Sequence, residues 1–335
     1  MNKLHRKARH TFMGLNMAIA LSLGVSLSLA TVPAHADNAR PTPYEYAIAS
    51  KLASKALLLD VVEAGTRLVA VGEFGHILFS DDNGANWTQA ASVPTRNTLT
   101  SVLFLDNQTG YAVGHEATIL KTTDGGNNWT LQYNERRGED PLFGIYFADA
   151  KNGLAVGGFA KTYETKDGGE TWVPRALIED SYDDFHLNDL FTDKKGNVYI
   201  PAEFGTVYKS RDRGKTWAPV ETGYDGSFWG GMGLANGDVL IHGMRGNAYL
   251  SSNGGKSWRQ LETGTDQSIT GGVQLADGTI VLTGLSGTIL VSTDGAKSFK
   301  VISRSDRLSF ATASRGASGQ VLLYGDPGVK AQAIK

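Results

Sequence analysis

Acidic residues that could act as catalytic acids, bases or nucleophiles recur in this chain within one short pattern, S/T-x-D-x-G-x-x-W. Its copies, two of them degenerate, are SDDNGANW (80–87), TTDGGNNW (122–129), TKDGGETW (165–172), SRDRGKTW (210–217), SSNGGKSW (251–258) and STDGAKSF (292–299). Glycoside hydrolysis is a chemistry that pairs of carboxylates perform, one as the acid and the other as base or nucleophile. The pattern therefore indicates either a glycosidase or a repeated turn.

The second interpretation explains every position of this pattern, which is known as the Asp box of sialidases. Ser, Thr and Asp side chains bond to backbone N–H groups a few residues on, glycine accepts positive φ, and the aromatic ring can bury against a sheet. Asn253 and Ala296 keep much of that chemistry. We therefore predict that the boxes are structural, through Asp82, Trp87, Asp124, Trp129, Asp167, Trp172, Asp212, Trp217, Asn253, Trp258, Asp294 and Phe299.

The spacing of the boxes indicates the elements that carry them. The boxes recur about every 42 residues, as does a G-x-x-small turn that begins ten residues before each boxed Asp or Asn. That turn begins at Gly72, Gly114, Gly157, Ala202, Gly243, Gly284 and, without a following box, Gly325. Each unit reads as four short strands, as in LTSVLFLDNQTGYAVGHEATILKTTDGGNNWTLQY. The sequence predicts an all-β chain, a single seven-bladed β-propeller of four-stranded antiparallel blades over residues 37–335.

The seventh unit supplies only three strands, so the ring needs a further element to close. We expect the N-terminal segment, residues 37–56, to provide it. A strand around Tyr44 to Ser50 would complete the blade, whereas AIASKLASKALLLD also fits a short capping helix. Both alternatives remain open from the sequence.

Residues 1–36 have the features of a cleaved secretory signal peptide. A basic start, MNKLHRKARH, precedes an apolar run from Gly14 to Ala30 and an A-x-A signal at Ala34–Ala36. An uncleaved membrane anchor is the alternative, but the run is short and interrupted by Gly and Ser. We expect cleavage after Ala36, a periplasmic location and no membrane span in the mature protein.

Composition limits the classes of partner. The chain has 32 basic and 34 acidic residues, a net charge of −2, and no cysteine. That balance does not favour nucleic acid, and the fold cannot contain disulfides. We expect a monomer.

The turns between the second and third strands should lie on the face of the ring opposite the boxes, together with the blade connections. Aromatic and arginine side chains, which are enriched in binding hot spots, concentrate in those loops. The candidate partner face consists of Phe74, Arg96, Glu116, Arg136, Arg137, Phe159, Phe185, Phe204, Phe228, Trp229 and Arg245. The alternatives are that the phenylalanines fill the ring centre and that the arginines are merely solvated.

Other chemistry has weaker support in the sequence. Carboxylates on the same face that could form a glycosidase pair are Glu73, Glu116, Asp183, Asp184, Glu203 and Asp326. Histidines 76, 115, 186 and 242 could gather near the axis but lack the spacing of metal ligands. A phosphate loop, a nucleophile elbow and an H-E-x-x-H motif are all missing, so we predict no catalytic residues, no metal and no cofactor.

Segments such as YAVGHEATILKTTDGGNNW resemble the repeats of the photosystem II assembly and stability factors. The resemblance covers essentially the whole mature chain. It implies a seven-bladed propeller, exported to the thylakoid lumen or periplasm, that binds client proteins through surface patches including arginines. We therefore predict a non-enzymatic scaffold or assembly factor for an exported or inner-membrane protein, in one version accessory to an envelope transport or assembly complex. The alternatives are a sialidase-like glycoside hydrolase or glycan-binding propeller and, more weakly, a chaperone for a cofactor or pigment.

Overall fold

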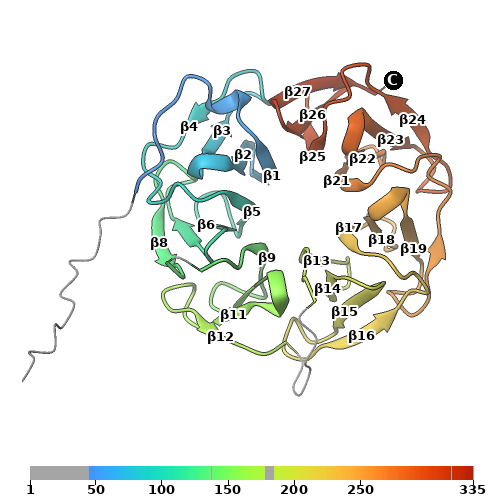
Figure 1. The fold of residues 1–335 in the computed structure, drawn as a ribbon, viewed down its shortest axis with the longest axis horizontal. Helices are drawn as coiled ribbons and strands as arrows, with labels where there is room; N and C mark the ends of the chain where they lie inside the picture. The colour runs from blue at the N-terminus through green and yellow to red at the C-terminus, as the bar shows by residue number, and fades with distance from the viewer. Residues whose placement is uncertain (1–44, 137, 178–184, 318, 335) are drawn as a thin grey trace, which may run out of the picture. The chain divides into compact units, whose positions relative to one another are not determined.

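The computed structural model describes residues 45–136, 138–177, 185–317 and 319–334. Within them, seven antiparallel sheets surround a central axis (Figure 1). The innermost strands are the first strands of the sheets, and the chain runs outward through each blade before it enters the next. The predicted all-β seven-bladed propeller is confirmed.

The strands of the first three blades are β1 (Leu58–Ala64), β2 (Arg67–Gly72), β3 (Ile77–Ser80), β4 (Thr88–Gln89); β5 (Leu99–Phe104), β6 (Gly110–Gly114), β7 (Ile119–Thr122), β8 (Thr130–Tyr133); β9 (Leu142–Phe147), β10 (Gly153–Gly157), β11 (Thr162–Thr165) and β12 (Val173–Pro174). Those of the next three are β13 (Phe191–Thr192), β14 (Val198–Pro201), β15 (Thr206–Ser210), β16 (Ala218–Glu221); β17 (Phe228–Gly233), β18 (Val239–Gly243), β19 (Ala248–Ser251), β20 (Arg259–Gln260); β21 (Ile269–Gln274), β22 (Ile280–Gly284), β23 (Thr288–Ser292) and β24 (Lys300–Ser303). The seventh blade has β25 (Phe310–Arg315), β26 (Gln320–Gly325) and β27 (Gly328–Ala333). Short 3-10 helices are η1 (Ala53–Lys55), η2 (Glu73–Gly75), η3 (Gly158–Ala160), η4 (Met244–Gly246) and η5 (Leu285–Gly287).

The core lies between neighbouring blades. Second strands such as β6 and β10 are buried along their whole length, because each is covered by a blade on both sides. Between the second and third blades, for example, Tyr111 stacks on Phe147 with ring centroids 4.2 Å apart, and Trp172 meets Phe147 edge-on at 6.0 Å. Burial of such large rings supplies most of the stabilisation in a chain without disulfides.

The seventh blade has three strands in the described part of the chain, and residues 45–50 are not its fourth strand. They run beside the first blade instead, where the Ala47 N–H donates to Val93 O at 2.9 Å and Gln89 bonds to Ser50 and Ile48. The helical turn η1 lies against β27. The strand alternative for ring closure is therefore wrong over these residues, whereas a short helical turn is present.

Each turn between the third and fourth strands, the 3–4 turn, is closed by its own side chains. In residues 80–87, Ser80 Oγ donates to Asp82 at 2.8 Å and accepts from the Gly84 N–H at 2.8 Å. Asp82 also accepts from the Asn86 N–H at 2.8 Å, and Trp87 Nε1 donates to Gly84 O at 3.2 Å. These hydrogen bonds hold the carboxylate as an anion and lower the pKa of Asp82 to about 2.

The 3–4 turns and the turns between second and third strands, the 2–3 turns, lie on opposite faces of the ring. The 3–4 turns bond to the turns between first and second strands, as in Gly125 N–H to Gln108 O at 2.9 Å. The 2–3 turns bond to the blade connections, as in Glu73 N–H to Leu57 O at 3.0 Å. We call the second surface, with residues 73–75, 115–117, 158–160, 203–205, 244–246 and 285–287 and the blade connections, the 2–3 face.

Candidate functional site

Three phenylalanines project from the 2–3 face at one equivalent position. Phe74, Phe159 and Phe204 are the middle residues of the 2–3 turns in blades 1, 3 and 4, with 59, 57 and 62% of each residue exposed. Their φ angles are 58°, 51° and 53°, in the left-handed region that disfavours bulky L-residues. The residues that line the central cavity do not include any of the three, so they do not fill the ring centre.

Blade connections support two of these rings. Phe159 meets His186 edge-on with ring centroids 4.7 Å apart, and its backbone N–H donates to His186 Nδ1 at 3.2 Å. Phe204 packs against half-buried Phe185 at 5.1 Å. The result is an apolar group on the face, with Phe185 as a supporting member.

The polar residues of the candidate partner face are spread more widely. Glu116 and Arg245 take the same turn position as the phenylalanines, with φ of 55° and 54°, and Arg245 is exposed. Exposed Arg96 bonds to Glu45 at 3.0 Å and to Tyr46 O at 2.9 Å, so it anchors the N-terminal segment. Arg136 is exposed, and Arg137 lies outside the described residues.

Two predicted members of that face lie elsewhere. Phe228 is fully buried, because it is the first residue of β17 and packs against Tyr249 at 5.5 Å. Trp229 occupies the bulge that follows and lines the central cavity. The prediction that Phe228 is a surface contact is wrong, because residue 228 begins a strand and does not lie in a loop. Trp229 lines the channel and is not part of the 2–3 face.

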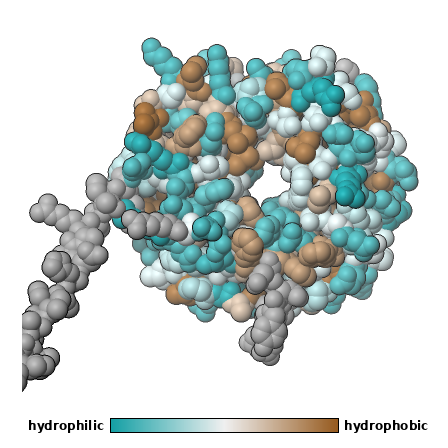
Figure 2. All heavy atoms as spheres, in the orientation of Figure 1, coloured by the Kyte–Doolittle hydropathy of each residue, from teal (hydrophilic) through white to brown (hydrophobic). Residues whose placement is uncertain are grey.

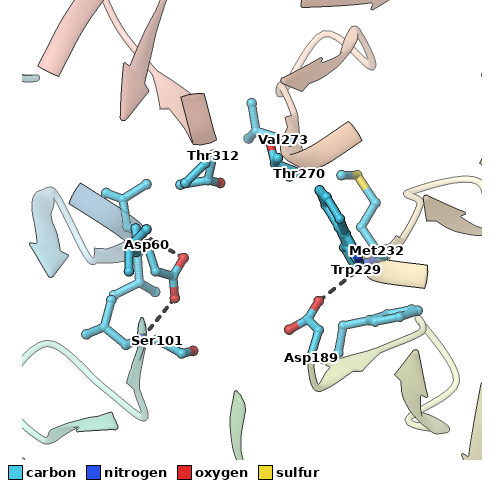
Figure 3. Close-up of a pocket in the computed structure, with 18 of the residues that line it drawn as sticks. Asp60, Ser101, Asp189, Trp229, Met232, Thr270, Val273 and Thr312 are labelled. Carbon is cyan, nitrogen blue, oxygen red and sulfur yellow. Dashed lines mark hydrogen bonds between the residues drawn. The ribbon is translucent and has the colours of Figure 1, made fainter. Parts of the chain in front are cut away.

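A channel through the ring is bounded by the innermost strands of the blades. It encloses about 620 Å³, within the roughly 300–1,000 Å³ typical of ligand pockets. Figure 2 shows it as an opening at the centre of the molecule. Its wall is formed by the innermost strands, with Asp60 and Ser101 on one side and Asp189 and Trp229 on the other (Figure 3).

Asp60 and Asp189 are held at equivalent places in this wall. Asp60 accepts from the backbone N–H groups of Val61 at 2.8 Å and Val102 at 2.9 Å. Asp189 accepts from Leu190 at 2.7 Å and Gly231 at 3.3 Å. Burial nevertheless raises the pKa of Asp60 to about 6 and that of Asp189 to about 7, and for Asp189 the charge of Asp60 contributes.

His242 of β18 also lines the channel and is 2% exposed. Its Nδ1 lies 3.2 Å from Ile269 O. A carbonyl oxygen only accepts, so Nδ1 carries the proton and Nε2 has the lone pair. Burial lowers the pKa of His242 to about 4, which keeps the ring neutral near pH 7.

Apart from His242, the polar groups singled out from the sequence do not line this cavity. Glu73 and Glu203 bond to the N–H groups of Leu57 at 2.9 Å and His186 at 3.0 Å, so they brace turns. Asp183 and Asp184 lie outside the described residues, and Asp326 is exposed. Of the four histidines only His242 lines the cavity, and the described residues contain no group of three or more potential His, Cys, Asp or Glu metal ligands.

Sequence reasoning missed Asp60 and Asp189, although a signal was present. Asp60 is the third residue of β1 and Asp189 lies two residues before β13, in the equivalent segments LLD and LND, and both blades carry the turn EFG, at 73–75 and 203–205. Comparison of equivalent repeat positions, rather than of loops alone, would have paired them.

Residues 135–281 match the family model described as photosynthesis system II assembly factor YCF48. The chain resembles the YCF48 family. No curated protein matches it.

Solved structures of YCF48 are similar over most of the chain. One, titled YCF48 bound to D1 peptide, has a TM-score of 0.67 and 17% identity, covering 88% of this chain and 95% of its own. YCF48 from Cyanidioschyzon merolae has a TM-score of 0.64 and 16% identity, covering 85% and 96%. The WD40 propeller domain of Doa1 is as similar in shape, with a TM-score of 0.65 and 14% identity over 87% and 96%, so these likenesses show the fold.

Proposed function

We propose that this protein is a non-enzymatic assembly factor that binds an exported or inner-membrane protein through its 2–3 face. The family resemblance, which matches residues 135–281 to an assembly factor, supports this class of function. The complex of a similar YCF48 propeller with a D1 peptide supports a polypeptide partner. The periplasmic location rests on the leader-like residues 1–36.

The observation that carries the proposal is the exposure of Phe74, Phe159 and Phe204 in left-handed turns. Left-handed backbone costs an L-residue roughly 1–2 kcal/mol, and an exposed ring gains little from burial in the free protein. Glu116, Arg245 and Ser286 take the same left-handed conformation at the equivalent position, so the turn itself accepts several residue types. A bulky aromatic residue is disfavoured in this conformation, and three exposed rings there therefore support a role in contact with a partner.

Affinity capture from detergent-solubilised envelopes tests the proposal. Tagged mature protein should retain one stoichiometric polypeptide, and the triple variant Phe74→Asn/Phe159→Asn/Phe204→Asn should lose at least 90% of it. Ser286→Asn is the matched control, because Ser286 has the same turn position and a φ of 54° but no ring. Equal capture by the triple variant and the wild type would refute docking on this face.

The periplasmic location has its own test. N-terminal sequencing of protein from the periplasmic fraction should begin at Asp37. Recovery of the intact chain from membranes would contradict cleavage. In the described residues no helix is long and apolar enough to span a bilayer.

A second candidate is glycan binding or glycoside hydrolysis in the channel, favoured by the Asp60 and Asp189 carboxylates. A pKa of about 7 would allow Asp189 to act as a general acid near neutrality. The described lining of the cavity contains no arginine, unlike the triad that sialidases use for their carboxylate substrate. Turnover of fluorogenic sugar conjugates that is abolished by Asp189→Asn would support this function, and no turnover between pH 5 and 8 would argue against it.

A further inference from the structure

We infer that the end of the channel next to the 2–3 face receives an arginine or lysine side chain of the polypeptide partner between Asp60 and Asp189. This inference rests on the proposed function, because the partner supplies the cation. It adds a chemically specific pocket to a face whose exposed rings are apolar.

The two carboxylates lie close to the 2–3 face because innermost strands begin there. Asp60 is the third residue of β1, and the preceding Leu57 bonds through both its N–H and its carbonyl to Glu73 of the 2–3 turn. Asp189 stands in the same relation to blade 4, where the His186 N–H donates to Glu203. The channel acids and the 2–3 turns are thus joined within single blades.

The same two blades combine both features in the sequence. Only blades 1 and 4 have an Asp at this strand position, and only they have the turn EFG, which carries Phe74 and Phe204. The other blades have Ser101, Gly144, Gly230, Gly271 and Thr312 at the strand position. A partner that contacts Phe74 and Phe204 therefore lies over the blades whose carboxylates enter the channel.

The wall around Asp189 offers acceptors of hydrogen bonds. His242 is only 2% exposed, and its Nε2 has a lone pair but no hydrogen-bond partner among the described residues. A methyl group added at Gly230 would lie 3.3 Å from both His242 Nε2 and Asp189 Oδ2. The absence of a side chain at Gly230 thus leaves the imidazole and the carboxylate facing one small space.

Among the described residues, the cavity lining offers these acids no positive charge. Its described lining includes Asp60, Glu63 and Asp189 but no Lys or Arg. Glu63, at the far end of β1, is paired with Arg315 at 2.7 Å. Asp60 and Asp189 form no ion pair among the described residues, so a cationic group from outside would relieve the cost of their burial.

The remaining lining favours an organic cation over a metal ion. Three or more acidic or histidine ligands do not cluster anywhere in the described chain. Guanidinium and ammonium groups carry several N–H donors. One such group can therefore donate hydrogen bonds to carboxylates and to a histidine lone pair that lie on separate walls of the channel. Trp229, Phe143 and Met232 provide apolar surface for the alkyl stem and an aromatic face for the charge.

The test uses blocked amino acids as probes of the intact mature protein. N-acetyl-arginine amide or N-acetyl-lysine amide should perturb the NMR resonance of the Trp229 indole. That resonance is identified by its loss in Trp229→Phe. Either probe should bind with an affinity at least tenfold above that of N-acetyl-citrulline amide. Citrulline matches arginine in shape but is neutral. Asp60→Asn/Asp189→Asn should remove the preference, whereas Glu63→Gln, with its acid at the other end of the strand, should keep it.

Two further measurements use wild-type protein, so that they do not depend on whether the variants fold. In wild-type protein, calorimetry in two buffers of different ionisation enthalpy should detect proton release on binding of blocked arginine at pH 6.5, because the carboxylates must ionise. Calcium chloride should not compete at millimolar concentration. Equal binding of citrulline and arginine, no proton release, or displacement by calcium would each overturn the inference.

Failure of this inference is distinguishable from failure of the proposed function. If citrulline and arginine bind equally but the phenylalanine variant loses its partner, only the channel site is wrong. If blocked arginine binds through Asp60 and Asp189 but no polypeptide depends on the phenylalanines, the cation pocket stands and docking on the face fails.

Discussion

The Asp60 carboxylate accepts a hydrogen bond from the Val102 N–H at 2.9 Å, and this contact joins the first blade to the second in the wall of the channel. Asp189 makes the equivalent contact with Gly231 between the fourth and fifth blades, at 3.3 Å. The carboxylates thus bridge neighbouring blades while their remaining acceptor capacity faces the cavity. This double role accounts for two carboxylates in a wall whose described lining includes no Lys or Arg.

Asp60 and Asp189, which are half-buried in the channel wall, predict that stability falls as the pH rises from 6.5 to 8. The folded-state pKa of Asp189, about 7, lies above its ordinary value of 3.8, so the folded state binds the proton more tightly than the unfolded state. The stabilisation from the extra bound proton is complete below about pH 4, is lost as the pH rises towards 7, and is gone above about pH 8. Where the folded state holds one proton more than the unfolded state, the unfolding free energy falls by about 1.4 kcal/mol per pH unit, so a loss of about 1 kcal/mol remains between pH 6.5 and 8. Urea unfolding at several pH values measures this slope.

Asp189→Asn separates this effect from other titrations. Its unfolding free energy relative to the wild type should improve from pH 6.5 to pH 8, since Asn cannot ionise. His242 acts in the opposite direction below pH 6.5, because burial lowers its pKa to about 4, so the comparison avoids that range. Parallel pH profiles for the variant and the wild type would show that Asp189 does not titrate in this window.

Lys209 predicts a second effect on stability. Its Nζ donates to Gly254 O across the interface of blades 4 and 5, and Lys209 is 8% exposed. Loss of a charged donor to a buried acceptor costs roughly 1–3 kcal/mol. Lys209→Met should therefore lower the melting temperature by several degrees, as measured by calorimetry.

Exposed Lys256, on the 3–4 turn of blade 5, is the matched control for Lys209. Lys256→Met removes the same charge at the surface and should change the melting temperature by less than about 1 °C, as surface substitutions usually do. Equal shifts for the two variants would indicate a general charge effect instead of a bond between blades.

The repeat made the fold predictable, but the residue at which the innermost strand of each blade begins was predicted less well. Gly72, Gly114 and their equivalents gave the register of every second strand, because these turns need small residues at close backbone contacts. Phe228 was misplaced because FWGGMG contains glycines that resemble a loop. In the structure, Gly231 and Gly233 pack against blade 4, where a Cβ would come within 2.5 Å of Phe191 and of Thr192 O.

The candidate site was only partly predictable, because the start of the innermost strands was uncertain from the sequence. Phe74, Phe159 and Phe204 were found because a turn position exposes them whatever surrounds the blade. Asp60 and Asp189 line the channel because their strands are innermost, and only a comparison of equivalent positions across the repeats, not of the loops alone, pairs them. The predicted fourth strand of the seventh blade does not form from the N-terminal segment, because Gln89 and Arg96 hold residues 46–50 beside the first blade.

Gly328 tests how the ring is closed. It begins β27 with a φ of 81°, and a Cβ there would lie 2.0 Å from the backbone oxygen of Ser54 in η1. Gly328→Ala should therefore destabilise the protein by both strain and collision. Gly319, with a φ of 76° and nothing within 4 Å of a Cβ, supplies strain alone. In urea unfolding Gly328→Ala should cost at least about 2 kcal/mol more than Gly319→Ala. Equal costs would show that η1 does not pack against β27 in solution.

Phe74 predicts a conflict between stability and binding. Its φ of 58° and ψ of 21° are favourable for Asn, unfavourable for Phe and worse for a β-branched residue. Its ring contact is a distant edge-on approach to His76 at 5.9 Å, so little packing is lost on substitution. Phe74→Asn should raise the melting temperature by about 2 °C, equivalent to roughly 1 kcal/mol in a chain of this size, whereas Phe74→Val should lower it. The opposite order would mean that the ring stabilises the free protein, and the strain argument for partner contact would lose its basis at this residue.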